Sequence, residues 1–585
     1  MSKKVPFSPV LGLAIGWANT HASLFGIKEN RYSLVDCQKS QTSLESELDL
    51  GKGVFEALHK LEKQANYALI DGSQRIIKAS RPQGKGVQQV ALTTSVGEWP
   101  KTVLVGLNQK GSLRAGRLLT ESMPIQLLGS FGLDALDVQA SMIETVVQLH
   151  PELFILTGGE DGSNAGVIQD WIDILRITCR LLPPSLKPTI LFAGNQALEP
   201  NVKRHLEPLS RLKIVPNLQP VVGEINLIPA QLALDQEIIR IWKKKSASLA
   251  ALSFFAKDLT GTNSFYMGRT VRWLARVKGL QEDQQNQNGI LALDLGVGTT
   301  TVSAARGGDA GTMMTPHYKK RFEILGDSTV EFIRQCMGSE YTQQGVIEFL
   351  GRLSIIPGIL PETVLELSIY QAIVRLRLQQ ALEKFNQNYP WLFYGPRHGL
   401  RGGMNSVIIS GDVFTHAPTQ SQLMMMLLDA IQPWGFTSFL MDRNQLLPLL
   451  GILGGLEPVL PVHILSSEAF STLGTVISPV SNAHLGKTIL SLEISGPNGI
   501  LFSGDIQQGT LTHIDVPEGL SAKLKVLPKS GTDIGLEEPG MGGEYELEGG
   551  GLGLVVDARG RPIKGAKDDE ERSFQREAWI NALEG

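Results

Sequence analysis

Residues 290–301 read Ile-Leu-Ala-Leu-Asp-Leu-Gly-Val-Gly-Thr-Thr-Thr, which is the most informative stretch of the chain. The pattern predicts a buried strand that reaches a glycine turn, after which hydroxyl side chains open a returning strand. Glycines let backbone N–H groups approach an anion, and threonine hydroxyls add donors without bulk. Asp294, at the end of the first strand, has the chemistry to hold a hydrated Mg²⁺ against phosphates. Taken alone, the stretch also fits a plain hairpin with a tight turn.

A second copy of this design lies near the N-terminus. Residues 11–20 read Leu-Gly-Leu-Ala-Ile-Gly-Trp-Ala-Asn-Thr, with a turn at Gly16 and a hydroxyl at Thr20. Because the unit occurs twice in one chain, phosphate binding is favoured over two unrelated hairpins. We predict that residues 11–27 and 290–305 form equivalent hairpins that face one another across a cleft between two lobes.

Composition restricts the class of protein. The chain has 585 residues, of which 42% are hydrophobic and 19% charged, so several globular domains are expected. The net charge of −4 gives no electrostatic case for nucleic acid. The three cysteines are far apart, which indicates a reducing compartment and no local zinc or iron–sulfur motif. No apolar run approaches the length of a transmembrane helix. We expect a cytoplasmic protein with no nucleic-acid or membrane partner.

Between the two hairpins, strands are predicted to alternate with helices, which is typical of a parallel sheet. The expected strands lie at 102–106, 153–157, 189–193 and 212–215. The small polar loops at 158–164 and 194–195 follow two of them, as contact points, ligand points or helix caps. Residues 281–288 (QEDQQNQN) predict a linker. After about residue 485, glycine turns and β-branched residues predict a compact tail with few contacts to the rest.

These patterns divide the chain into five predicted segments, listed in chain order. They are a first lobe segment (1–89), an inserted α/β module (90–240), a helical connector with a polar linker (241–288), a second lobe (289–484) and a β-rich C-terminal domain (485–585). The resemblance described next implies that both lobes are ATPase-like.

The two hairpins resemble the first and second phosphate loops of the actin, heat-shock-chaperone and sugar-kinase superfamily. Residues 408–413 (Ile-Ile-Ser-Gly-Asp-Val) resemble its adenosine-contacting strand and glycine turn. More specifically, the chain is similar to the glutamate mutase accessory protein L family (called MutL or GlmL) over roughly residues 10–480, because matching segments occur in the same order. Those segments are 93–97, 155–162, 193–195, 215–217, 325–327 and 432–435.

The resemblance implies an α/β protein with a two-lobed actin-like (ribonuclease H-like) ATPase fold, an inserted parallel-sheet module and a C-terminal β-rich domain. It implies ATP and Mg²⁺ as cofactors, neither bound covalently, with Asp294 as the metal ligand. The nucleotide- and phosphate-binding residues that it implies are Gly16, Thr20, Asp294, Gly296, Gly298, Thr299, Thr300, Thr301, Ser410 and Gly411.

The chain departs from the family pattern inside these loops. In the first loop, Ala14 replaces an acid of the pattern, Trp17 and Ala18 replace two hydroxyl residues, and His21 replaces a lysine. In the second loop, Thr301 replaces a second acid. In the adenosine turn, Asp412 replaces a glycine. Loss of a metal-coordinating carboxylate usually cripples hydrolysis and leaves the fold intact. We therefore predict that ATP binding and hydrolysis are weak or lost, and that Mg²⁺ changes them little.

Three functions remain open at this point. The resemblance implies an accessory or reactivase-like protein whose partner is a cobalamin-dependent mutase subunit. A nucleotide-inactive scaffold (a pseudo-ATPase) for protein assembly is the second alternative. A small-molecule kinase of the same superfamily is the third, although Ala14 and Trp17 count against it because a kinase needs both phosphate loops intact.

Overall fold

The first lobe is built on the N-terminal glycine hairpin. The structure is a computed structural model that describes residues 9–43, 50–79, 85–132, 138–163, 166–257, 259–279, 289–317, 327–337, 342–356, 358–393, 402–536, 538–566 and 568–584. Within these residues the first lobe holds a five-stranded sheet in the order β10-β4-β1-β2-β3. Its strands are β1 (Val10–Ile15), β2 (Asn19–Lys28), β3 (Arg31–Gln41), β4 (Gln89–Thr94) and β10 (Thr260–Thr262).

The second lobe repeats this arrangement. Its sheet runs β13-β12-β11-β14-β15-β16-β22-β19. In both lobes an antiparallel hairpin (β1–β2, β11–β12) continues into a third antiparallel strand, and its first strand pairs in parallel with a later one (β4, β14). The strands are β11 (Gly289–Leu295), β12 (Thr299–Arg306), β13 (Asp309–Pro316), β14 (Met404–Ser410), β15 (Gly435–Asp442), β16 (Ser471–Ser478), β19 (Leu511–Ile514) and β22 (Leu554–Asp557). The duplicated sequence unit is therefore a duplicated sheet topology.

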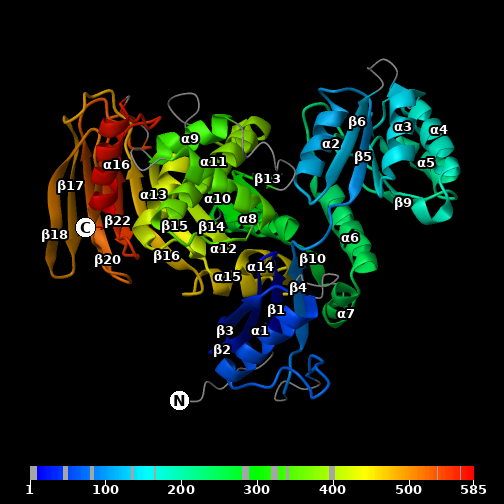
Figure 1. Cartoon of the computed structure of the whole chain (residues 1–585), viewed down its shortest axis with the longest axis horizontal. Helices are drawn as coiled ribbons and strands as arrows, with labels where there is room; N and C mark the ends of the chain where they lie inside the picture. The colour runs from blue at the N-terminus through cyan, green and yellow to red at the C-terminus, as the bar shows by residue number, and fades with distance from the viewer. Residues whose placement is uncertain are drawn as a thin grey trace.

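A separate parallel sheet forms the inserted module, which stands apart on the right of Figure 1. The order is β6-β5-β7-β8-β9, and every pair is parallel. The strands are β5 (Lys101–Gly106), β6 (Gln126–Gly132), β7 (Leu153–Leu156), β8 (Thr189–Phe192) and β9 (Arg211–Ile214), and the helices are α2 (Ser112–Glu121), α3 (Val138–Leu149), α4 (Gly166–Leu181) and α5 (Glu199–Leu206). The sequence pattern had predicted four of these strands and missed β6.

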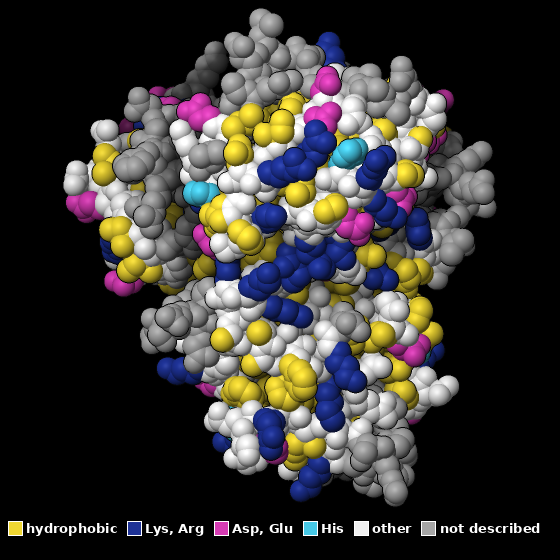
Figure 2. Space-filling view, turned by 90° about the vertical axis from the view of Figure 1, so that its right-hand side faces the viewer, with side chains coloured by type: hydrophobic (Ala, Val, Ile, Leu, Met, Phe, Trp, Pro, Cys, Tyr) yellow, Lys and Arg dark blue, Asp and Glu magenta, His cyan; other side chains and the backbone are white. Residues whose placement is uncertain are grey.

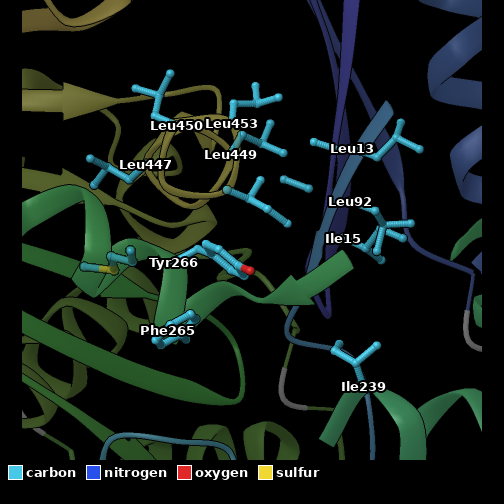
Figure 3. Packing of buried hydrophobic residues seen from close by; sticks show 14 of the residues in the cluster. Leu13, Ile15, Leu92, Ile239, Phe265, Tyr266, Leu447, Leu449, Leu450 and Leu453 are labelled. Carbon is cyan, nitrogen blue, oxygen red and sulfur yellow. The ribbon is translucent and has the colours of Figure 1, made fainter. Parts of the chain in front are cut away.

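One apolar cluster spans the junction of the two lobes. Helix α14 (Leu446–Leu453) is buried along its whole length and packs against the sheet of the first lobe and against α8 (Asn263–Gly279). Figure 3 shows leucines of α14 facing Leu13, Ile15 and Leu92 of that sheet. The approach is close, because a Cβ on Gly12 would lie 2.8 Å from a methyl of Leu449. The predicted connector takes part too, since it supplies α8 and the edge strand β10.

The remaining helices cover the sheets or link the parts. They are α1 (Leu50–Ala65) on the first lobe, α6 (Ile228–Lys245) and α7 (Ala247–Ala256) between module and first lobe, and α9 (Asp327–Met337), α10 (Gln343–Ile355), α11 (Val364–Asn388), α12 (Asp412–Thr415), α13 (Gln420–Ile431) and α15 (Val459–Leu465) in the second lobe. None of the helices in the described segments is long and apolar enough to cross a bilayer. The predicted linker at 281–288 lies outside the described residues.

Ion pairs tie α6 to the module. The carboxylate of Glu237, with 3% of its side chain exposed, meets Arg211 of β9 at 3.0 Å and Arg240 at 2.6 Å. At the end of the helix, Lys245 contacts Glu98 at 2.8 Å and Glu152 at 2.9 Å. Figure 2 shows a band of Lys and Arg side chains across the middle of this side of the molecule. Because Lys245 pairs with two carboxylates, the basic end of α6 contributes to the contact between this helix and the module.

The expectation of an independent tail is wrong. A four-stranded antiparallel sheet does form there, in the order β18-β17-β20-β21, but the tail also completes the sheet of the second lobe. Strand β22 pairs in parallel with β16, and β19 pairs with β22. The tail sheet strands are β17 (Thr488–Gly496), β18 (Gly499–Gln507), β20 (Ser521–Pro528) and β21 (Gly543–Glu548), and α16 (Asp569–Glu584) ends the chain.

A buried charge network joins the tail to the second lobe. Asp557 and Arg559, both with 0% of the side chain exposed, are 2.8 Å apart, and Arg559 also reaches Asp429 of α13 at 2.8 Å. Arg561 contacts the other oxygen of Asp557 at 3.0 Å. Buried charges persist only when they are paired, so these contacts bind the tail to α13 of the second lobe.

Candidate functional site

The two glycine turns have the same backbone geometry. The N–H of Gly16 donates to the carbonyl of Asn19 at 2.9 Å, and the N–H of Gly296 donates to the carbonyl of Thr299 at 2.9 Å. In register, Ile15 lies opposite Thr20, and Leu295 lies opposite Thr300. The hairpins that the sequence predicted as equivalent therefore share the same turn hydrogen bond and the same strand register next to the turn.

The turns meet at one small cavity of about 30 Å³ between the lobes. Its walls include six of the residues singled out from the sequence, namely Gly16, Asp294, Gly296, Gly298, Thr299 and Gly411. Ala14 and Asp412 also line it. Both hairpins and the turn after β14 thus face a common point, as predicted. Their binding of a nucleotide stays a prediction.

The remaining predicted residues do not line this cavity. The hydroxyl of Thr20 is buried and lies 2.9 Å from the hydroxyl of Thr42. The hydroxyl of Thr300 lies 2.7 Å from Nε2 of His317. Thr301, with 3% of its surface exposed, pairs across the ladder with Asp294. The hydroxyl of Ser410 points toward Asp442, at 3.4 Å. Two of the three threonine hydroxyls here are already bonded within the protein.

The turn after β14 requires glycine. Gly411 has a φ of +110°, and a Cβ there would lie 2.3 Å from the carbonyl oxygen of Leu295. This close contact brings the end of β14 against the end of β11. It also carries the next residue, Asp412, to the rim of the cavity.

Acidic groups gather at the cavity. Burial, followed by the charges of Asp412 and Asp442, raises the pKa of the Asp294 carboxyl to about 7, against a hydrogen bond from Gln445. Asp442 is buried and accepts the backbone N–H groups of Leu446 and Leu447, each at 2.9 Å. Burial nevertheless raises its pKa above the ordinary value. Carboxyl groups therefore lie at and beside the cavity where the two glycine turns meet.

His21 supplies a cation next to this cluster when its ring is protonated. Its Nε2 lies 3.8 Å from Oδ1 of Asp412, a distance for an ion pair and too long for a hydrogen bond. Burial opposes ionisation of Asp412, but the neighbouring His21 and Asn19 outweigh it and hold the pKa of that carboxyl below its usual value. The sequence singled out both residues as departures without pairing them, and no local signal would have paired positions so far apart.

The metal prediction rests on a single side chain. Among the described residues, no group of three or more His, Cys, Asp or Glu side chains is arranged to hold a metal ion. Asp294 faces the cavity, while Asp442 is committed to the N–H groups at the start of α14. Asp294 as an Mg²⁺ ligand stays a prediction.

A larger cavity of about 780 Å³ adjoins the small one and shares Trp17, Asn19 and Asp412 with it. Its outer walls come from α1, from the segment after α10 and from α11, and they include Lys52, Glu56, Ile356, Leu360 and Tyr370. This volume lies within the range of small-molecule sites.

The polar loops of the module bind one another. The amide of Asn217 donates to the carbonyl of Gly159 at 2.8 Å, and the N–H of Gln196 donates to Asp161 at 2.9 Å. The amide of Asn195 donates to the carbonyl of Ser163 at 3.1 Å. These bonds join the loops after β7, β8 and β9, so holding the loops together accounts for the small polar residues. Asn164, the end of the first loop, lies outside the described residues.

Two lobes of repeated topology, with glycine hairpins meeting at an interlobe cavity, define a two-lobed actin-like ATPase-type fold. The inserted parallel-sheet module and the β-rich C-terminal part complete the predicted fold class. The chain belongs to the MutL protein family, because the profile of this family matches residues 10–469. That match confirms the resemblance to the glutamate mutase accessory protein L family.

The solved structures to which the chain is similar include several with low sequence identity. No protein with curated function matches the sequence. Among solved structures, the chain is similar to nucleotide-free acetone carboxylase at 10% identity, over 86% of this chain and 81% of that chain, with a TM-score of 0.30. It is also similar to a glycerol dehydratase reactivase at 10% identity, over 77% of this chain and 100% of that chain, with a TM-score of 0.29. The type II variant of the Aquifex aeolicus Ppx/GppA phosphatase matches at 9% identity, over 76% of this chain and 79% of that chain, with a TM-score of 0.18.

Proposed function

We propose that this protein is an accessory, reactivase-like partner of a cobalamin-dependent mutase subunit and that its interlobe cleft binds ATP weakly or not at all. Family membership over residues 10–469 supports the accessory role. The observation that carries the statement on ATP is the small cavity of about 30 Å³, where both glycine turns meet. Space of this size suits about one water molecule, so a triphosphate would have to lie in the adjoining cavity of about 780 Å³, whose walls include none of the glycines of the turns.

The groups around that cavity also disfavour phosphates. Asp294 and Asp412 line it, and a phosphate placed beside a carboxylate pays like-charge repulsion in a poorly solvated site. The hydroxyls of Thr20 and Thr300 bond to protein partners, and neither residue lines the cavity. A competent phosphate loop needs the opposite arrangement, with donors facing the cavity and carboxylates reserved for a metal.

Calorimetry on the full chain tests the statement on ATP. We expect a dissociation constant on the order of 1 mM for ATP, changed little by removing Mg²⁺. Asp412→Gly restores the residue of the family pattern and should tighten binding, as should Ala14→Asp in the presence of Mg²⁺. Asp515→Gly removes an equally negative but exposed tail residue and serves as the matched control. Micromolar affinity with steady turnover in the unmodified protein would overturn this part of the proposal.

Affinity capture tests the partner. The tagged full chain, passed over native lysate, should retain a cobalamin-dependent mutase subunit, and the two purified proteins should then co-elute from a sizing column. Failure of the purified pair to associate, with or without ATP, would contradict the accessory role. Reproducible recovery of an unrelated assembly would favour the scaffold instead.

A further inference from the structure

A second cavity, of about 600 Å³, lies outside the interlobe cleft, between the module and the second lobe. One wall holds Leu118 of α2 and Gln231 of α6. The opposite wall holds the turn from Gly308 to Thr312, which opens β13. Helix α8 passes along the side and presents Arg272 and Arg276 to the cavity.

The two arginines share one face of α8 because residues four apart lie one helical turn apart. Neither makes a hydrogen bond or ion pair with any residue in the described part of the chain. Burial, then the charges of Arg276 and Arg269, lowers the pKa of the Arg272 guanidinium. A partly buried guanidinium without a counter-charge is costly, so an arrangement of this kind indicates an anionic ligand.

The acidic residues nearby do not neutralise this pair. Glu224 and Asp309 lie at the cavity wall but are exposed to solvent. Glu121, whose charge reaches Tyr389, is engaged by Lys384 at 2.9 Å and by the amide of Asn388 at 2.6 Å. The positive charge of the cavity is therefore left for a ligand.

An aromatic pair completes the wall. Tyr389 and Trp391 both line the cavity, with ring centroids 5.7 Å apart and planes at 70°. Trp391 keeps 44% of its surface exposed, so part of its ring is available to a ligand at the cavity wall. An exposed indole beside arginines suits a ligand with both a flat apolar part and a negative charge.

We propose that this cavity binds a small organic anion that carries a flat ring, with its phosphate or carboxylate at Arg272 and Arg276 and its ring against Trp391. The volume of about 600 Å³ falls within the range of small-molecule sites. Because the walls come from both the module and the second lobe, the ligand stabilises their contact by mass action. The site is separate from the interlobe cleft, so it does not depend on the function proposed above.

Titration calorimetry and thermal unfolding of the full chain test this site, with phenyl phosphate and benzoate as probes. We expect saturable binding of at least one probe and a rise in the unfolding temperature with its concentration. Arg272→Gln should weaken that binding at least tenfold, and inorganic phosphate alone should bind less tightly than phenyl phosphate. Without ligand, Arg272→Gln should unfold at the same temperature as the wild type or higher, because it removes a partly buried charge that has no counter-charge.

Lys244→Gln is the matched control, since it removes one positive charge from the exposed end of α6, outside the cavity. It should leave probe binding unchanged. The proposal is overturned if neither probe binds saturably, or if Arg272→Gln binds the probes as tightly as Lys244→Gln does. Binding that Arg272→Gln retains and Asp412→Gly alters would place the probe in the interlobe cleft instead.

Discussion

The carboxyl at the centre of the cleft should make folding stability depend on pH. The pKa of Asp294 rises from the ordinary 3.8 to about 7 on folding, through burial and then the charges of Asp412 and Asp442. Between about pH 4 and pH 7 the folded protein thus keeps a proton that the unfolded chain has released. Stability contributed by this group is full at low pH and is lost as pH rises toward 7. Asp294→Asn should remove that loss.

The magnitude follows from the shift. About three pKa units at 1.36 kcal/mol each give an upper limit of about 4 kcal/mol between pH 4 and pH 8. Asp294 is partly exposed at the cavity, so solvent screening reduces the expected effect to about 1–2 kcal/mol. Asparagine keeps the size and one acceptor oxygen of the side chain. We therefore expect Asp294→Asn to be more stable than the wild type at pH 8 and close to it at pH 5.

Urea unfolding at pH 5, 6, 7 and 8 measures this difference. Asp235→Asn is the comparison variant, because burial raises the pKa of Asp235 to about 7 as well, against two hydrogen bonds from Thr262. Because both carboxyls have a raised pKa, both variants should flatten the dependence of unfolding free energy on pH. Because Asp235 lies on α6, away from the cleft, only Asp294→Asn should change how ATP affinity varies with pH. If Asp294→Asn kept the full wild-type decline between pH 5 and pH 8, the carboxylate cluster would not be a source of electrostatic strain.

Three further outcomes are expected. Arg559→Met breaks the buried network of the tail and should cost about 3–5 kcal/mol and expose the tail to limited proteolysis, whereas Lys523→Met on the exposed side of β20 should do neither. Gly411→Ala should lower the unfolding temperature far more than Gly486→Ala. Both glycines have a positive φ, but only at Gly411 would a Cβ lie within 3 Å of backbone atoms. Equal losses in the two variants would contradict this. Lys245→Ala removes two partly exposed ion pairs and should change the unfolding free energy by about 1 kcal/mol or less, so a larger loss would show that α6 holds the module more tightly than we infer.

Much of the fold could be predicted from the sequence because its signals are local. A strand that ends in glycines and returns with hydroxyl residues specifies a hairpin within a dozen positions, and the two copies at Gly16 and Gly296 gave the two lobes. The alternation of strands and helices in the module is equally local. Strand β6 escaped prediction because Gln126–Gly132 is only partly buried and contains two glycines, which weakens the pattern.

The C-terminal tail shows what the local sequence pattern cannot predict. The glycine-rich sequence after about residue 485 correctly predicted strands, but it could not say with which sheet they pair. Asp557, Arg559 and Arg561 are charged residues, which sequence pattern assigns to the surface, and yet they are buried because each meets its counter-charge only after folding. The partner Asp429 comes from α13, far away in the chain.

For the candidate site, the sequence determined which residue types stand at the glycine turns and where they depart from the family pattern. Only the tertiary structure decided that Asp294, Asp412 and Asp442 share one neighbourhood, and that Thr20 and Thr300 turn their hydroxyls to other protein groups. The physical reason is that chain order fixes only neighbours along the backbone. Electrostatic energy and cavity volume depend on distances through space. Those distances are set only when folding brings the ends of strands from remote segments close together.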